Sequence, residues 1–335
     1  MPDLNRSVSR QTNFSSTWPI NMVDPQELHS SRRQKVFGAM ALLGCVLCWG
    51  VVPVILRQLT GSINAWSANG IRYPLAAVCY WPVLWFAWSN GKLDKDLLRL
   101  ALIPAVFAWL GQVFWGLAPY YLPASAIGFY VRFSMVPALT VAMFLFRDER
   151  RLLLVPRFYW GLALIVGGFL WFSLVQGSAR LPGHWIGVSV MLACSLFFGM
   201  YGVSVRYFLR TKSPVLSFAV VAQYVSLGTF STMILWGDTQ NIPMMDGSDW
   251  LRIAISTLLG ISLGHIFMYA SIRALGAAIT SSVQTLTPFV TVAMAALILS
   301  EQMTRSQWFA GITMVAGALV LVVTKPPKSD PAQET

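Results

Sequence analysis

The sequence predicts an all-α integral membrane protein of ten transmembrane helices, arranged as two inverted five-helix repeats. Composition is the first reason, because 56% of the 335 residues are hydrophobic and only 11% are charged, too little polar surface for a soluble protein of this length. The second is that the apolar residues gather into runs of roughly 20 residues, the length that a helix needs to cross a bilayer. The third is that the two halves of the chain carry the same landmarks in the same order.

The apolar runs are separated mostly by short connections, and each is read as one membrane-spanning helix. They occupy 36–56, 66–88, 99–118, 124–146, 158–176, 185–209, 214–236, 251–272, 277–300 and 306–324. Residues 1–35 are polar and lack the apolar core of a signal peptide, so we expect a disordered cytoplasmic N-terminal tail. Residues 325–335 are expected to form a cytoplasmic C-terminal tail.

Basic residues predict the orientation of these spans. With the N-terminus inside, sixteen Lys and Arg residues flank the spans on the cytoplasmic side and four flank them outside, which is the bias that sets membrane topology. Both termini are therefore expected in the cytoplasm of a multi-pass protein of a bacterial-type inner membrane. The net charge of +11 does not predict nucleic-acid binding, because the basic residues lie at span ends and form no single face.

Two five-span repeats, 36–177 and 184–324, are predicted from four landmarks that recur at an offset of about 150 residues. An odd number of spans per repeat makes the second copy enter from the opposite side of the membrane, as in secondary transporters. The landmarks are Leu110-Gly111-Gln112-Val113-Phe114 with Leu263-Gly264-His265-Ile266-Phe267, Gly50 and Arg57 with Gly199 and Arg206, Pro137 with Pro288, and Glu149 with Glu301.

These residues resemble the ten-helix EamA-type branch of the drug/metabolite transporter superfamily over about 36–324. The resemblance is carried by Trp49-Gly50, Pro53, Arg57 and Arg72, and by the duplicated signatures from Ala124 to Glu149 and from Ala277 to Glu301. It implies a carrier whose central cavity between the halves opens alternately to each side. Known members export amino acids and other small metabolites, and relatives move nucleotide sugars or drugs. The sequence departs from the pattern in having Phe198 before Gly199 and an additional arginine, Arg132.

Arg72 and Arg132 are the strongest candidates for substrate binding. Both are predicted about 10–12 Å inside the membrane, where a charged side chain needs a partner or a function. A guanidinium there favours an anionic substrate group, although either side chain can instead bond to carbonyls at a helix break. Their counterparts in the second repeat are approximately Gln223 and Gln284, so only the first half carries charge at these positions.

Further candidates for the cavity lining are uncharged. Gln112 and His265 occupy equivalent mid-span positions, and His265 is the one intramembrane group able to change its protonation near neutral pH. Because no Asp or Glu lies inside a span, facilitated diffusion, exchange and coupling through His265 remain as transport modes. Aromatic candidates, each of which can equally be a packing residue, are Trp49, Trp115, Phe129, Tyr201 and Tyr269.

A secondary transporter of amino acids or similar small amphipathic or anionic metabolites is the predicted function, with export as the expected direction. Multidrug efflux, a lipid flippase and a non-transporting membrane protein are the alternatives. An enzyme is not expected, because the chain lacks an intramembrane acid, a metal-binding motif and a nucleotide-binding loop. The four cysteines lie inside predicted spans, so neither a metal nor another cofactor is predicted. The expected partners are the small-molecule substrate and membrane lipids, around a monomer or homodimer.

Overall fold

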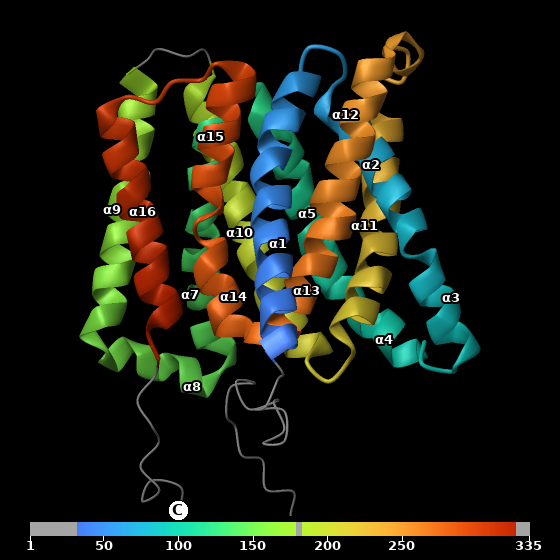
Figure 1. Ribbon diagram of the computed structural model, residues 1–335, viewed down its shortest axis with the longest axis horizontal. Coiled ribbons are helices and arrows are strands. Elements are labelled where there is room, and N and C mark those ends of the chain that lie inside the picture. Colours follow the sequence, from blue (N-terminus) through green and yellow to red (C-terminus); the bar gives the residue numbers. More distant parts are fainter. Residues whose placement is uncertain (1–31, 179–182, 326–335) are drawn as a thin grey trace, which may run out of the picture.

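The computed structural model describes residues 32–178 and 183–325, and every regular element in those ranges is helical. The helices run side by side along the length of one bundle (Figure 1). In chain order the α-helices are α1 (Arg32–Leu59), α2 (Ala65–Cys79), α3 (Trp81–Ser89), α4 (Lys95–Leu100), α5 (Leu102–Leu117), α6 (Ala124–Tyr130), α7 (Met135–Leu145), α8 (Arg147–Arg150), α9 (Pro156–Ser178), α10 (His184–Leu209), α11 (Pro214–Trp236), α12 (Gly247–Thr257), α13 (Gly264–Leu275), α14 (Ala277–Gln284), α15 (Thr287–Leu299) and α16 (Arg305–Val323).

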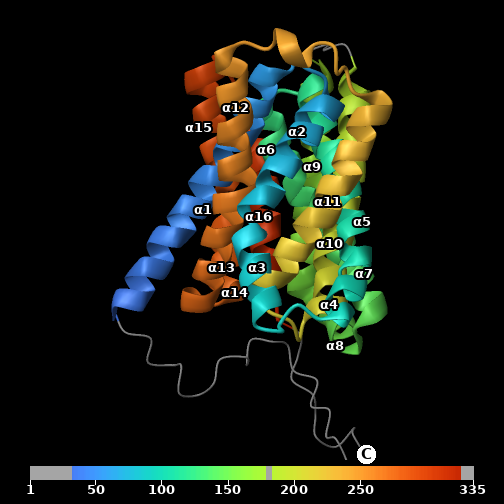
Figure 2. The ribbon, with the colours of Figure 1, turned by 90° about the vertical axis from the view of Figure 1, so that its right-hand side faces the viewer.

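Nine helical stretches within the described ranges are long and apolar enough to cross a membrane. The tenth predicted span, 66–88, is divided into α2 and α3. Pro82 explains the division, because it has no N–H to donate to the carbonyl of Val78 and its ring disfavours a continuous helix. The two short helices follow each other along one side of the bundle, the side that faces the viewer in Figure 2 (Figure 1, Figure 2), so together they take the place of the predicted crossing.

Three other crossings change their helical geometry near their centres. The 3₁₀ turn η4 (Val131–Ser134) joins α6 to α7, and the π-helical turn η7 (Leu258–Leu263) joins α12 to α13. Between α14 and α15 the helix is interrupted ahead of Pro288. Because an N–H at position 288 would donate to the carbonyl of Gln284, Pro288 leaves that carbonyl available to another donor.

The two ends of the bundle are distinguished by the start of α1 and the end of α16, which lie together at the lower end in Figure 1. We call this the terminal end, and the other the opposite end. Glu149 follows α7 at the terminal end, whereas Glu301 follows α15 at the opposite end. The repeated landmarks therefore lie on opposite sides of the molecule, as expected for inverted repeats.

Each repeat contributes its first long helix to the other repeat. Helix α1 packs against α13 and α15, and α10 packs against α5 and α7. We call α1 with α12–α15 the α1 bundle, and α10 with α5–α7 the α10 bundle. The pairs α2–α11 and α9–α16 flank these two bundles, and α9 and α16 lie side by side at the left of Figure 1.

Large apolar side chains cover much of the outer surface. Exposed examples are Trp85, Phe144, Leu154 and Leu297, each more than two-thirds exposed. Such a surface is stable in a hydrocarbon solvent, and the helices satisfy their own backbone groups there. Inside, the helices approach closely at small residues: a Cβ at Gly264 would lie 2.3 Å from the indole nitrogen of Trp49.

Candidate functional site

Arg132 lies at the contact between the two bundles. Its 3₁₀ turn η4 belongs to the α10 bundle, and its Nη1 donates to the backbone carbonyl of Gln284, 3.0 Å away in the α1 bundle. That carbonyl is available because Pro288 supplies no N–H for it, and Thr287 Oγ1 also donates to it at 2.7 Å. Since Arg132 and Gln284 occupy equivalent positions of the two repeats, their contact marks the centre of the molecule.

The guanidinium of Arg132 is only partly satisfied. Its Nε is buried and has no hydrogen-bond partner among the described residues. The ion pairs found in the described ranges, Arg206–Glu149, Lys212–Asp94 and Arg252–Asp249, all lie elsewhere. A buried donor on a charged group without a counter-charge is costly, so this position favours an anionic ligand.

The surroundings of Arg132 are otherwise weakly polar. The side-chain amide of Gln284 donates to Cys45 Sγ of α1 at 3.3 Å. All four cysteines are unbonded to one another, and no group of three or more metal-ligating residues occurs in the part of the chain that the structure describes. The chemistry at this position is therefore hydrogen bonding and charge.

An aromatic cluster lies one turn further along α1. The indole Nε1 of Trp49 donates to the carbonyl of Gly260 in the π-helical turn η7, at 3.1 Å. The ring of His265 stands edge-on to Trp49 with centroids 5.3 Å apart and stacks on Phe218 at 3.9 Å. Tyr269, one turn further along α13, also contacts Phe218, with ring centroids 6.2 Å apart. Apolar or aromatic parts of a ligand fit such a surface.

The tautomer of His265 is fixed by its helix. Its Nδ1 lies 2.9 Å from the carbonyl of Ile261, and a carbonyl can only accept a hydrogen bond. Nδ1 therefore carries a proton, which leaves Nε2 as the nitrogen that gains or loses one.

Arg72 is placed in a different environment from Arg132. It is buried and fully engaged: Nε donates to Ser256 Oγ at 2.9 Å, Nη2 to the Ser256 carbonyl at 3.2 Å and Nη1 to Asn69 Oδ1 at 3.2 Å. Asn69 in turn donates to the carbonyl of Gln112 at 2.8 Å. This network joins α2 to α5 and to the end of α12, just before η7, so it supports the backbone on which the aromatic cluster rests.

The remaining predicted residues are distributed over both sides of this centre. At the break between α2 and α3, the side-chain amide of Gln223 donates to the carbonyl of Ala77 and accepts from the indole Nε1 of Trp81, so both of its polar atoms are occupied there. Trp115 packs 6.2 Å from Phe198, and Phe129 has no exposed surface in this conformation. Gln112 and Tyr201 are partly buried.

Two residues near this centre were not predicted from the sequence. Phe218 contacts His265 from α11, and Tyr80 donates from its hydroxyl to the carbonyls of Ile261 and Ser262, both at 3.1 Å. Tyr80 had a usable signal, because it precedes Trp81-Pro82, where a helix break leaves backbone groups unpaired. No sequence signal distinguishes Phe218, because it is one of many phenylalanines in the apolar runs.

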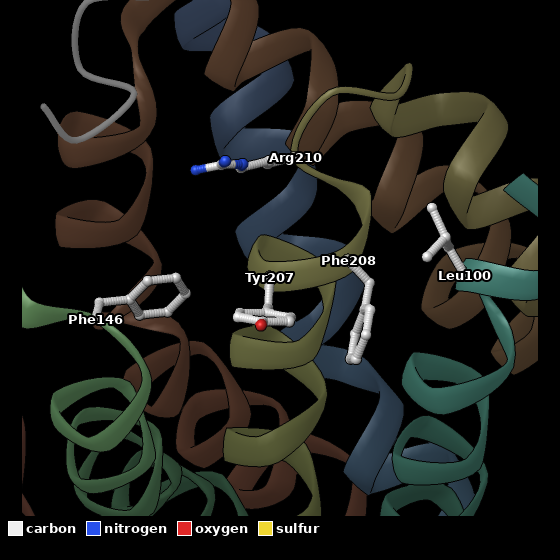
Figure 3. Close-up of a pocket in the computed structure, with 5 residues that line it drawn as sticks. All are labelled: Leu100, Phe146, Tyr207, Phe208 and Arg210. Carbon is white, nitrogen blue, oxygen red and sulfur yellow. The ribbon is translucent and has the colours of Figure 1, made fainter. Parts of the chain in front are cut away.

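A cavity of about 440 Å³ lies apart from these residues, at the terminal end of α10. It is lined by Leu100, Phe146, Tyr207, Phe208 and Arg210. Figure 3 shows Tyr207 and Phe208 side by side on their helix, between Phe146 and Leu100, with Arg210 further along. None of the predicted substrate-binding residues lines this cavity.

Comparisons with known proteins agree with this architecture. The model of the EamA-like transporter family matches the chain twice, over residues 36–174 and 185–323. An uncharacterized transporter of Synechocystis sp. is 27% identical over 333 residues, covering 95% of this chain and 87% of its own. An uncharacterized transporter of Archaeoglobus fulgidus is 22% identical over 204 residues, 59% of this chain and 60% of its own.

A crystallised protein shares the fold. It superposes with a TM-score of 0.56 at 15% identity, covering 86% of this chain and 97% of its own. The two matches to the family model lie in succession, in a helical bundle whose landmarks recur at opposite ends. The chain is a transporter and not an enzyme, and it belongs to the EamA-like transporter family.

Proposed function

We propose that this transporter exports amino acids or similar small amphipathic carboxylates by alternating access, and that Arg132 binds their carboxylate. The single observation that carries the proposal is the buried Nε of Arg132, which lacks a partner at the contact of the two bundles. A guanidinium with open donors binds a carboxylate in a fork of two hydrogen bonds. Trp49, His265 and Phe218 then offer rings to the substrate side chain.

Arg72 is assigned a supporting role in this proposal, because Ser256 and Asn69 already occupy its nitrogens. Gln284, Gln112, Tyr201 and Tyr269 remain candidates for the lining of the path, while Gln223, Trp115 and Phe129 are bonded or packed in the described conformation.

The orientation that we propose places the terminal end in the cytoplasm of a bacterial-type inner membrane. Most of the basic residues that flank the crossings lie at that end, which is the distribution found on the cytoplasmic side of membrane proteins. Release toward the opposite end is then export.

The proposed requirement for a carboxylate is tested by comparing each amino acid with its amide and by substituting Arg132. Purified protein in proteoliposomes is assayed by counterflow with a panel of labelled amino acids, and each active amino acid is compared with its amide as competitor. We expect the acid to compete at least ten-fold better than the amide, and Arg132→Gln to abolish that preference while Arg132→Lys keeps part of it.

Arg252→Gln is the control, because Arg252 pairs with Asp249 at the opposite end and is removed from the centre. An Arg132→Gln protein that transports amino acids with unchanged preference for the acid would refute the role of Arg132. Equal competition by acids and amides in the parent protein would instead refute the proposed substrate class.

A further inference from the structure

Glu149 and Glu301 end equivalent helices of the two repeats, yet they make different contacts. Glu301 accepts hydrogen bonds from the backbone nitrogens of Ala124 and Ser125, both at 2.9 Å, and from Ser125 Oγ at 2.7 Å. These three donors belong to the first residues of α6, so Glu301 of one repeat caps a helix of the other. We call this contact the Glu301 cap.

The Glu301 cap holds the two bundles together at the opposite end, because Glu301 follows α15 of the α1 bundle and α6 belongs to the α10 bundle. A carboxylate at a helix N-terminus satisfies N–H groups that have no partner within the helix and interacts favourably with the helix dipole. Arg57 of α1 reinforces the same junction by donating to the carbonyl of Pro119, just before α6.

At the terminal end the equivalent contact is absent from the described residues. Glu149 is buried and pairs with Arg206 at 2.7 Å. Arg206 belongs to α10, and Glu149 lies in α8, which directly follows α7 of the α10 bundle. The guanidinium of Arg206 also lies over the ring of Phe146, 4.0 Å from its centroid. Helix α14, the counterpart of α6, begins after Gly276 with no side-chain cap. Glu149 thus bonds within its own bundle, whereas Glu301 bonds across.

We propose that Glu149 and Glu301 exchange partners during transport and close the two ends of the molecule in turn. In the described conformation the Glu301 cap is formed and Glu149 is held by Arg206. In the alternate conformation Glu149 leaves Arg206 and caps α14 at Ala277, while Glu301 leaves α6 and pairs with Arg57, the counterpart of Arg206. The proposal rests on alternating access but not on the identity of the substrate.

A difference in sequence between the two repeats explains why the Glu301 cap, and not a Glu149 cap, is formed in the described conformation. The spacing that relates Glu149 to Glu301 places Ala277 opposite Ser125. The Glu301 cap therefore has a hydroxyl donor that the Glu149 cap would lack. One hydrogen bond to a charged acceptor corresponds to roughly a ten-fold change in an equilibrium constant, enough to favour one conformation.

The exchange is tested by measuring distances at both ends of the same protein with paired spin labels. One pair is Trp185→Cys with Gln302→Cys, which spans the bundles at the opposite end, and the other is Arg147→Cys with Arg273→Cys at the terminal end. Cys79→Ser removes the one exposed native cysteine, and the other three are buried. The protein is measured in lipid nanodiscs without substrate, so the result is independent of the proposed carboxylate site.

Ser125→Ala removes a donor from the Glu301 cap alone, and Ala277→Ser adds one to the Glu149 cap alone. We expect both variants to shift the population about ten-fold toward a form with a longer distance at the opposite end and a shorter one at the terminal end. Ser125→Thr keeps the hydroxyl, and Ser231→Ala removes one that bonds within α11; both should match the parent. Unchanged distances, or a change at one end only, would overturn the exchange.

A second pair of variants tests whether Glu149 does more than stabilise Arg206. Both are made in the Ser125→Ala protein. Exchanging the charges, Glu149→Arg with Arg206→Glu, keeps an ion pair but removes the acceptor that would cap α14. Ala277→Pro leaves Glu149 untouched and deletes one N–H at a helix position where proline is tolerated, so it folds even if the exchanged pair does not. Each is expected to suppress the second population; its persistence in Ala277→Pro would refute the Glu149 cap.

Discussion

Two arginines that the sequence places at similar depth have different surroundings in the structure. Arg72 donates to Ser256 and Asn69 and joins three helices, whereas Arg132 keeps one buried nitrogen without a partner. Depth inside a span is readable from the chain, because it depends only on counting residues along a helix. The partners on other helices, Ser256 and Gln284, are not readable in this way, because they lie more than 150 positions away and depend on how the helices pack.

Arg72→Gln should destabilise the protein by about 2–3 kcal/mol, because it leaves the Ser256 carbonyl and the Asn69 amide without their charged donor. The expected result is a lower thermal unfolding temperature in detergent, measured by intrinsic tryptophan fluorescence. Arg252→Gln is the matched control: this arginine also contacts α12 residues, but it is partly exposed, and its loss should cost less than about 1 kcal/mol. Equal losses in the two variants would contradict the bonding role of Arg72.

Asp94 gives the stability of the terminal end a dependence on pH. Hydrogen bonds from Lys212 and from the N–H of Leu97 hold the pKa of this carboxyl below its ordinary value of 3.8. Because the pKa is lower in the folded state, the carboxylate stabilises the fold above the unfolded pKa, and this contribution is lost as the pH falls through the folded pKa. The pair is exposed, so the contribution is small.

Asp94→Asn should therefore unfold at a lower temperature than the parent near neutral pH, and the two curves should converge below pH 3.8. Lys212→Gln should behave the same way, since it removes the other member of the pair. A difference between parent and Asp94→Asn that persists unchanged well below that pH would show that the ion pair is not its source.

At the level of helices, the positions of the membrane spans can be predicted from the sequence, whereas the breaks within the helices can be predicted only in part. Three predicted spans begin and end within two residues of the observed helices α9, α10 and α11, namely 158–176, 185–209 and 214–236. They agree because the thickness of the hydrocarbon core sets both the length of the apolar run and the length of the helix that crosses it. Helix α1 begins at Arg32, inside the predicted tail, because a helix continues past the apolar run where polar side chains reach the interface. Prolines mark the breaks at Pro82 and Pro288, but no residue type marks the π-helical turn at Leu258–Leu263.

Pro288→Ala should repair the break between α14 and α15. The new N–H donates to the carbonyl of Gln284 and competes there with Arg132. We expect slower hydrogen–deuterium exchange over residues 285–289 and slower counterflow, because the position of Arg132 is disturbed. Pro214→Ala is the control, since Pro214 is the first residue of α11, where an N–H has no acceptor within the helix. Unchanged exchange in Pro288→Ala would show that packing, not proline, keeps this break open.

At the scale of the molecule, the duplicated sequence predicts that the second repeat is inverted relative to the first. It does not predict that the two repeats exchange their first helices. Glu149 and Glu301 lie at opposite ends, as five crossings per repeat require. Nothing in the order of landmarks indicates that α1 packs against α13 and α15 of the other repeat. This exchange of first helices places the Arg132–Gln284 contact between two mixed bundles, so the site that we propose there draws on both repeats.

The proposed orientation of the bundle in the membrane can be tested by labelling cysteines at its two ends. Basic residues gather at the terminal end, and on this distribution rests the proposal that this end lies in the cytoplasm. In intact cells expressing the Cys79→Ser protein, a membrane-impermeant maleimide should label Gly61→Cys and Gln240→Cys, which are exposed at the opposite end. It should leave Lys92→Cys and Lys212→Cys unlabelled until the membrane is permeabilised. The reverse pattern would invert the molecule, and the proposed export would become uptake.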